Sequence, residues 1–107
     1  MTEVLDLKSC SHTDRAFAVL GKRWTGLIVD LLLQRPARFS ELEKAVPGLS
    51  KRLLGERLRE LESLGLVDRT VDPGPPITST YSLTDRGEAL RPALNALRDW
   101  AEENVSP

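Results

Sequence analysis

The segment of this sequence with the greatest capacity for chemistry is residues 50–64, where leucines and charged residues alternate at helical spacing. At about 100° per residue, Leu54, Leu58 and Leu61 fall on one face of a helix. The opposite face carries the side chains that could meet a ligand, which are Arg52, Gly55, Glu56, Arg59 and Ser63. This pattern is typical of a helix that reads DNA from the major groove, and equally of an amphipathic helix whose charged face is solvated.

The N-terminal end of this helix favours the first interpretation. Ser50 is placed as an N-cap, and the basic residues Lys51 and Arg52 follow it in the first turn. Basic residues there oppose the helix dipole, which makes sense where a polyanion meets the helix end. Arg52 is the candidate for base readout, because arginine is the commonest partner of guanine O6 and N7. Gly55 has no side chain, so the helix could approach the base edges closely.

Charge is distributed unevenly, although the net charge of the chain is only −1. Residues 22–59 carry nine Lys or Arg against four acids, and the remaining segments are each acidic. A local basic segment on a near-neutral chain suits a protein that touches phosphate with one face. The predicted contacts with double-stranded DNA are Arg38, Ser40, Ser50, Lys51, Arg52, Gly55, Glu56, Arg59 and Arg69.

Length and composition narrow the class of protein. The 107 residues suffice for a single domain, which we expect to cover 1–107. No apolar run approaches the roughly 20 residues that span a bilayer, and the N-terminus lacks the pattern of a secretory signal. The one cysteine, Cys10, excludes an intramolecular disulfide framework. We therefore expect a cytoplasmic protein that does not bind a membrane.

Catalytic and metal chemistry have little support. The sequence contains no nucleophile elbow and no glycine-rich loop that would cradle a phosphate. Cys10 and His12 could complete a four-ligand zinc site only by pairing two subunits. We expect no enzyme activity, no metal site and no cofactor.

Helical patterns cover the first two thirds of the chain. Residues 13–20 and 23–34 predict two helices, and Pro36 ends the second. A third, short helix is predicted to open with a capping box that has Ser40 at N-cap and Glu43 at N3. A turn at 46–49 then leads into the leucine-faced helix, and two short helices joined by a glycine-containing turn indicate a helix-turn-helix.

The pattern changes after Gly65. Residues 66–71 and 78–83 are rich in β-branched residues and predict a two-stranded ribbon, with the proline-rich stretch 72–76 at its tip. A final helix over 85–103 is predicted to begin at Thr84 or Asp85. The expected fold is mainly α with a small antiparallel β-ribbon, a winged helix-turn-helix, in which the N- and C-terminal helices form a dimer interface.

In order and spacing, several pieces of the chain resemble the HxlR-type winged-helix transcription regulators of bacteria and archaea. The matching pieces are Cys10, residues 20–25, 38–42, 47–54, 57–62, 65–69, Pro75-Pro76, 81–84, Gly87 and Trp100. This resemblance covers roughly residues 10–101. It implies a cytoplasmic, dimeric DNA-binding regulator, and a cysteine near the position of Cys10 that senses electrophiles or oxidants in some members.

Two features depart from that family. It usually has Gly-Gly-Lys-Trp where this chain has Gly21-Lys22-Arg23-Trp24. The ribbon tip also has no Lys or Arg between Thr70 and Asp85. We therefore expect the wing to add little affinity for DNA unless Arg69, hydroxyls or backbone N–H groups supply it.

A homodimer is predicted from apolar residues that one small domain does not need for its core. The candidates are Leu5, Leu7 and Phe17 of the N-terminal arm (1–11) and first helix, and Leu90, Leu94, Leu97 and Trp100 of the last helix. Two-fold symmetry would place two recognition helices about 34–36 Å apart on a pseudo-palindromic operator.

Single residues leave alternatives open. Trp24 and Phe39 are expected in the core rather than as stacking platforms for bases, and Arg57 as a pairing partner rather than a base reader. Cys10 could be a sensing thiol or a small packing residue. The alternatives to a thiol-responsive repressor are a winged helix that docks on protein and a repressor that responds to a small molecule.

Overall fold

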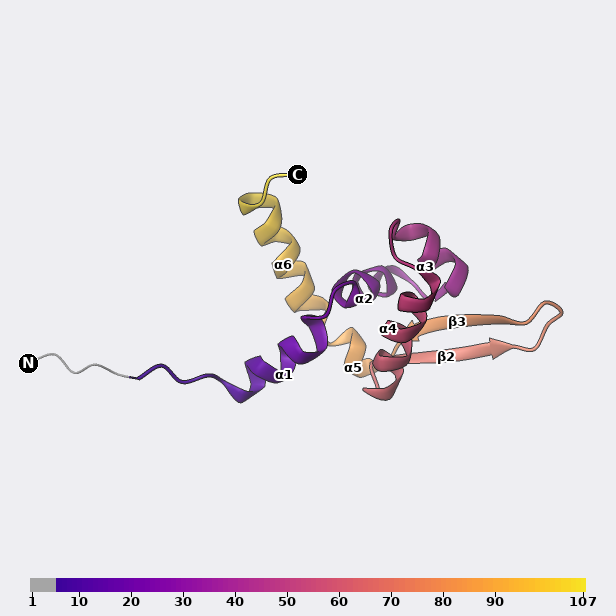
Figure 1. Ribbon diagram of the computed structural model, residues 1–107, viewed down its shortest axis with the longest axis horizontal. Coiled ribbons are helices and arrows are strands. Elements are labelled where there is room, and N and C mark those ends of the chain that lie inside the picture. Colours follow the sequence, from indigo (N-terminus) through magenta and orange to yellow (C-terminus); the bar gives the residue numbers. More distant parts are fainter. Residues whose placement is uncertain (1–5) are drawn as a thin grey trace, which may run out of the picture.

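The computed structural model describes residues 6–107 and confirms a winged helix-turn-helix (Figure 1). Six helices and three strands occur in the described part of the chain. In order they are α1 (Ser11–Leu20), α2 (Thr25–Gln34), β1 (Ala37–Arg38), α3 (Phe39–Ala45), α4 (Lys51–Ser63), β2 (Val67–Asp72), β3 (Thr78–Leu83), α5 (Asp85–Glu88) and α6 (Arg91–Asn104).

The core lies where α2, α3 and α4 meet the base of the sheet. Leu54, Leu58 and Leu61 of α4 are each at most 1% exposed, as the leucine pattern predicts. They share this core with Ile28 of α2 and Leu42 of α3. Trp24, expected in the core, is only partly buried and packs at its margin, and so does Phe39.

The sheet has one strand more than the ribbon that the sequence predicts. Strand β3 pairs antiparallel with β2, with Val67 opposite Leu83, and its other edge pairs with the two-residue strand β1, where Ala37 lies opposite Tyr81. Two residues after Pro36 carry no periodic signal, so β1 forms only because the edge of β3 offers it partners. It ties the start of α3 to the base of the wing.

The capping box predicted at Ser40 and Glu43 is wrong by two residues. Helix α3 begins at Phe39, and its N-cap is Arg38. Glu41, at N3, accepts a hydrogen bond from the Arg38 backbone N–H at 3.0 Å. Pairing of β1 with β3 fixes Arg38 in extended backbone, so the helix starts immediately after it and Ser40 lies within its first turn.

Helix α2 begins at Thr25, two residues later than predicted. Trp24 precedes it with φ of 81°, in the left-handed region that a bulky residue rarely adopts. Two interactions hold this conformation: Arg57 Nε donates to the Arg23 carbonyl at 3.1 Å, and the Ile28 N–H donates to the Trp24 carbonyl at 3.0 Å.

The predicted last helix over 85–103 is interrupted. Thr84 caps the short α5 by accepting from the Gly87 N–H at 3.2 Å, and α6 starts at Arg91. Pro92 lies in the first turn of α6. It explains the break, because proline lacks the N–H that would bond Glu88 and its ring would clash with that carbonyl in a continuous helix.

Helices α1 and α6 extend away from the body on the side opposite the ribbon (Figure 1). Neither contains a buried residue. Residues 6–10 precede α1 without regular secondary structure and are exposed. Leu5, predicted in the dimer interface, lies outside the described residues.

Ser50 is the N-cap of α4, as predicted, and its Oγ accepts from the Leu53 N–H at 3.1 Å. We expect Ser50→Ala to lower the free energy of unfolding by about 1 kcal/mol, because one helix N–H loses its acceptor. Urea denaturation followed by circular dichroism measures this. Ser63→Ala is the matched control, since Ser63 at the other end of α4 only donates to the Arg59 carbonyl. Equal losses in the two variants would contradict the capping role.

Candidate nucleic-acid interface

The exposed face of α4 presents Arg52 and Glu56 as an ion pair one turn apart. The Arg52 side chain is 89% exposed, and its Nε lies 3.3 Å from Glu56 Oε1. An exposed pair at this spacing contributes only about 0.3–0.5 kcal/mol, so a better partner can detach the guanidinium. Arg52 is thus accessible to a partner, and its weak ion pair with Glu56 can be exchanged for a contact with that partner.

Gly55 and Arg59 lie next to each other on the same face. An ideal Cβ at Gly55 would be 3.3 Å from Arg59 Nη1, so the arginine lies over the glycine. Lys51, in the first turn, is 3.9 Å from Glu43 Oε2 of α3. The predicted α4 contacts are therefore brought together on one surface, with Ser50 at its N-terminal end.

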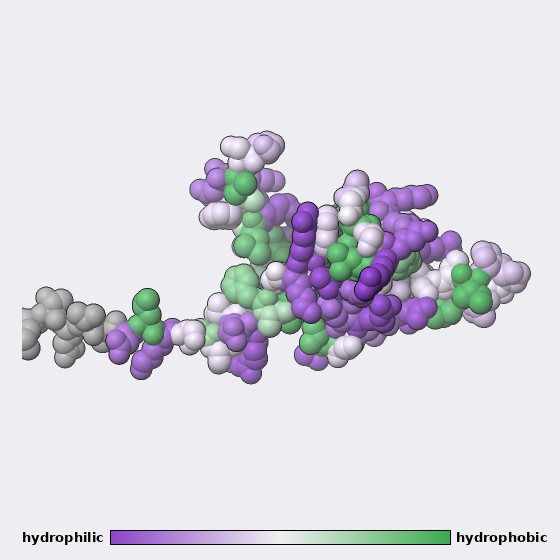
Figure 2. Space-filling view, viewed as in Figure 1, coloured by the Kyte–Doolittle hydropathy of each residue, from purple (hydrophilic) through white to green (hydrophobic). Residues whose placement is uncertain are grey.

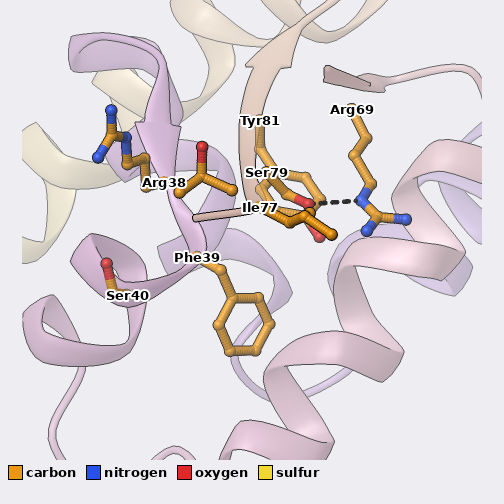
Figure 3. Close-up of a pocket in the computed structure, with 8 residues that line it drawn as sticks. Arg38, Phe39, Ser40, Arg69, Ile77, Ser79 and Tyr81 are labelled. Carbon is orange, nitrogen blue, oxygen red and sulfur yellow. Dashed lines mark hydrogen bonds between the residues drawn. The ribbon is translucent and has the colours of Figure 1, made fainter. Parts of the chain in front are cut away.

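An open groove of about 460 Å³ separates the start of α3 from the wing (Figure 3). Arg38 and Arg69 lie on opposite sides of it, and Ser40, Ser79 and Tyr81 complete much of its lining. Arg69 Nε donates to Ser79 Oγ at 3.0 Å. Within residues 6–107, neither arginine forms an ion pair. The groove thus brings three of the predicted DNA contacts together beside α4.

Glu41 lies beside this groove and forms hydrogen bonds with Arg35 and with the Arg38 backbone. Its hydrogen bond with Arg35, 2.5 Å between Arg35 Nη2 and Glu41 Oε2, and then that with the Arg38 N–H lower the pKa of the Glu41 carboxyl to about 2. The carboxylate is therefore ionised at neutral pH and is satisfied by Arg35. The Arg38 guanidinium has no ion-pair partner among the described residues.

The contacts of Arg57 confirm the prediction that it is a pairing residue rather than a base reader. Its side chain is 16% exposed, and Nη1 lies 3.1 Å from Glu60 Oε1. Glu60 also meets Lys22 at 3.2 Å. Together with the bond to the Arg23 carbonyl, these contacts join α4 to the segment that connects α1 and α2.

The wing tip is apolar where a cation was missing from the sequence. Ile77 is 74% exposed and Val71 is 49% exposed. The turn between them is closed by the Gly74 N–H, which donates to Asp72 Oδ1 at 3.1 Å. Positive charge near the wing comes instead from Arg69 at its base.

Cys10 is the N-cap residue of α1 and is exposed. Hydrogen bonding to the Thr13 side chain, and then to the backbone N–H groups of Thr13 and His12, lowers the pKa of its thiol. This direction is the one expected for a thiol at a helix N-terminus. In the described part of the chain, no three His, Cys, Asp or Glu side chains gather as a metal site.

The predicted interface residues divide into two groups. Leu90 and Leu94 are half-buried against the core of their own chain. The others are exposed: Leu7, Phe17 at 67%, Leu97 at 57% and Trp100 at 58%. Figure 2 shows apolar surface gathered over α1 and α6.

Two interactions of arginine side chains were not predicted from the sequence. The Arg35–Glu41 pair joins residues on either side of β1, and no pattern marks it. Arg23 stacks on Trp24, with 4.5 Å between the guanidinium carbon and the ring centroid, and only the adjacency of the two residues could have suggested it. Among the described helices, none is long and apolar enough to cross a bilayer.

Comparison with known sequences identifies related proteins over nearly the whole chain. A family model described as HxlR-like helix-turn-helix matches residues 19–107. The uncharacterized HTH-type transcriptional regulator YvaP of Bacillus subtilis is 49% identical over 98 residues, which cover 92% of this chain and 91% of YvaP. The HTH-type transcriptional regulator YodB of the same bacterium is 40% identical, over 92% of this chain and 88% of YodB.

Solved structures agree with the sequence relationships. The reduced form of B. subtilis YodB superposes with a TM-score of 0.79 at 39% identity, covering 94% of this chain and 98% of YodB. The redox regulator HypR in its oxidized form gives a TM-score of 0.84 at 31% identity, covering 90% of this chain and 99% of HypR. YodB has also been solved after diamide treatment and with quinone bound.

Proposed function

This chain belongs to the HxlR-like helix-turn-helix family of transcriptional regulators, and from that premise we propose that it binds a specific sequence of double-stranded DNA as a homodimer. It is a regulator, not an enzyme. Such a protein would act in the cytoplasm, where it meets DNA. The observation that carries the proposal is the surface around α4, on which Arg52 is 89% exposed and three further arginines lie nearby.

Those arginines support a division of labour between base and backbone contacts. Arg52 leaves Glu56 and reads a guanine edge from the first turn of α4, while Gly55 allows close approach. Arg38 and Arg69 flank the groove beside the wing and meet backbone phosphates, which set position without reading sequence. Ser40, Ser50 and Lys51 add hydroxyl and ammonium donors at the N-terminal ends of α3 and α4.

A dimer accounts for the exposed apolar residues of α1 and α6. Phe17, Leu97 and Trp100 are each more than half exposed on helices without a buried residue. Apolar area left in water is unfavourable by about 25 cal/mol per Å², and a second copy of the chain covers it. Leu90 and Leu94, already half-buried, would border that contact.

Cys10 supports a thiol-responsive regulator. Its thiol is exposed and has a lowered pKa, which are the two properties of a reactive cysteine. Relatives with solved structures include a diamide-treated and a quinone-bound form of YodB. Oxidation of two Cys10 thiols by diamide would join the N-terminal arms of a dimer in a disulfide, with both protons and both electrons passing to diamide. A repressor that responds instead to a bound small molecule is the second candidate.

The first prediction that follows from the proposed function concerns the α4 surface. We expect Arg52→Ala to weaken binding to a selected operator by about 1–3 kcal/mol and to relax specificity, because a base contact is lost. Lys51→Ala should weaken all sequences alike. Fluorescence anisotropy with operator and random duplexes measures both, and Arg86→Ala is the control, since the exposed Arg86 lies on α5, beyond the C-terminal end of α4.

Two outcomes would contradict that assignment. If Arg52→Ala and Lys51→Ala shifted operator and random DNA equally, neither variant would distinguish base from backbone. Phosphate contacts release counterions, so binding to duplex DNA should weaken steeply as salt rises. If the affinity of the wild type for duplex DNA hardly changed with salt, the α4 surface would not contact phosphates, and the alternative of a protein partner would be favoured.

The second prediction concerns the dimer. Light scattering at micromolar concentration should show a particle of twice the 11.9 kDa chain mass. Charge in an apolar interface is strongly unfavourable, so Trp100→Glu should dissociate it. Ile77→Glu is the matched control, because Ile77 is 74% exposed on the wing, away from α1 and α6. A wild-type monomer, or dissociation by Ile77→Glu alone, would refute the proposed interface.

The third prediction concerns Cys10. Treatment with diamide or a quinone should lower operator affinity of the wild type and leave Cys10→Ser unaffected. A non-reducing gel should show a cross-linked dimer after diamide in the wild type only. Unchanged wild-type affinity together with no cross-link would leave Cys10 as an unreactive residue and favour the small-molecule alternative.

A further inference from the structure

Several basic side chains close to α4 have an acidic partner. Lys22 and Arg57 share Glu60, Arg52 pairs with Glu56, and Lys51 lies near Glu43. Arg23 differs, because its exposed guanidinium has no ion-pair partner in the described part of the chain. A cation that the fold leaves unneutralised is available to an outside anion.

The position of Arg23 is fixed rather than free. Its guanidinium carbon lies 4.5 Å from the centroid of the Trp24 ring, a cation–π geometry. Its carbonyl accepts from Arg57 Nε at 3.1 Å, so α4 holds its backbone. The Trp24 ring reaches the turn before α4, since an ideal Cβ at Gly48 would be 3.8 Å from Trp24 Cη2. The stack is therefore built against the recognition helix.

Arg23 lies on the side of α4 that faces away from the wing. Around the helix, the face of Arg52 and Arg59 is bordered by Gly55 on one side and by Arg57 and Glu60 on the other. Arg57 contacts Arg23 directly. In Figure 1, the α1–α2 junction and the β2–β3 ribbon lie on opposite sides of α4. Arg38 and Arg69 are thus placed beside one flank of the DNA-facing surface, and Arg23 beside the other.

We propose that Arg23, stacked on Trp24, donates to a backbone phosphate of the bound duplex on the flank of α4 opposite the wing. This inference rests on the proposed function. A guanidinium held flat by an aromatic ring keeps its N–H donors pointing outward, and it can make two parallel bonds to one phosphate. Phosphate contacts on both flanks would fix how α4 sits in the groove. The lack of a cation at the wing tip makes this second contact more important.

The primary test compares Arg23→Ala with Arg86→Ala. Arg86 is also exposed and has no ion-pair partner among the described residues. It lies on α5, and its guanidinium is next to Gly65, beyond the C-terminal end of α4: an ideal Cβ at Gly65 would be 3.0 Å from Arg86 Nη1. We expect Arg23→Ala to bind operator and random DNA roughly tenfold more weakly and to reduce the salt slope by about 0.9, one phosphate contact. Arg86→Ala should change neither. Arg23→Lys keeps the charge but not the fork, and should recover the slope with only part of the affinity.

A double-mutant cycle then identifies the phosphate. Duplexes with a single neutral methylphosphonate, moved one position at a time along the operator, should include one that weakens the wild type and hardly affects Arg23→Ala. Circular dichroism and thermal unfolding of each variant confirm that the fold is kept.

The outcomes separate this inference from the function on which it rests. If Arg52→Ala relaxes specificity while Arg23→Ala binds like the wild type, the Arg23 contact is wrong and the DNA-binding function stands. If Arg86→Ala loses as much as Arg23→Ala, the effect is one of net charge and the positioned contact is refuted. If the wild type binds no duplex, both proposals fail.

Discussion

Burial of one leucine face of α4 is the constraint on which the rest of the structure depends. Leu54, Leu58 and Leu61 are at most 1% exposed, and a helix that buries them has no freedom to rotate about its axis. The residues on the opposite side, Arg52 and Arg59 among them, must then face outward. The Ser50 cap fixes where this helix starts, and so which side chains occupy its first turn. The position and orientation of Arg52 and Arg59 thus follow from packing and capping in which neither arginine takes part.

Carboxylates decide which cations remain available. Glu41 neutralises Arg35 and caps α3, and Glu60 engages both Lys22 and Arg57. Among residues 6–107, the basic residues without an ion-pair partner around α4 include Arg23, Arg38 and Arg69, on its two flanks. Net charge is a poor guide here, since a chain of net charge −1 can still present a cationic surface where its acids are engaged in pairs. This selection also explains how a wing tip without a cation is compatible with the proposed DNA-binding surface.

The half of the molecule formed by α1 and α6 is held to the rest by polar contacts and lies outside the buried core. Its amphipathic helices contain no fully buried residue, while the Arg98–Asp30 ion pair and the Arg91 bond to the Leu33 carbonyl hold α6 to α2. Cys10 occupies the N-cap position of α1, and the segment after α1 contacts α4 through Arg23 and Lys22. A displacement of α1 would therefore be felt at the recognition helix through a short series of direct contacts. The proposed dimer, the thiol and the DNA surface are linked physically by that segment.

Sequence alone determined the elements whose signals are local. The leucine period, the Ser50 cap, the glycine turn at 46–49 and the β-branched ribbon each arise within a few residues, and together they predicted the winged helix-turn-helix and the α4 surface. Pro92 was also a local signal, although the helical period around it concealed the break. Tertiary structure decided the rest: strand β1, the left-handed Trp24 beside the Arg23 carbonyl that Arg57 holds, and the pairing of Lys22 with Glu60 and of Arg98 with Asp30. These depend on partners distant in the chain, whose approach is set by the packed core and not by any period or spacing in the sequence.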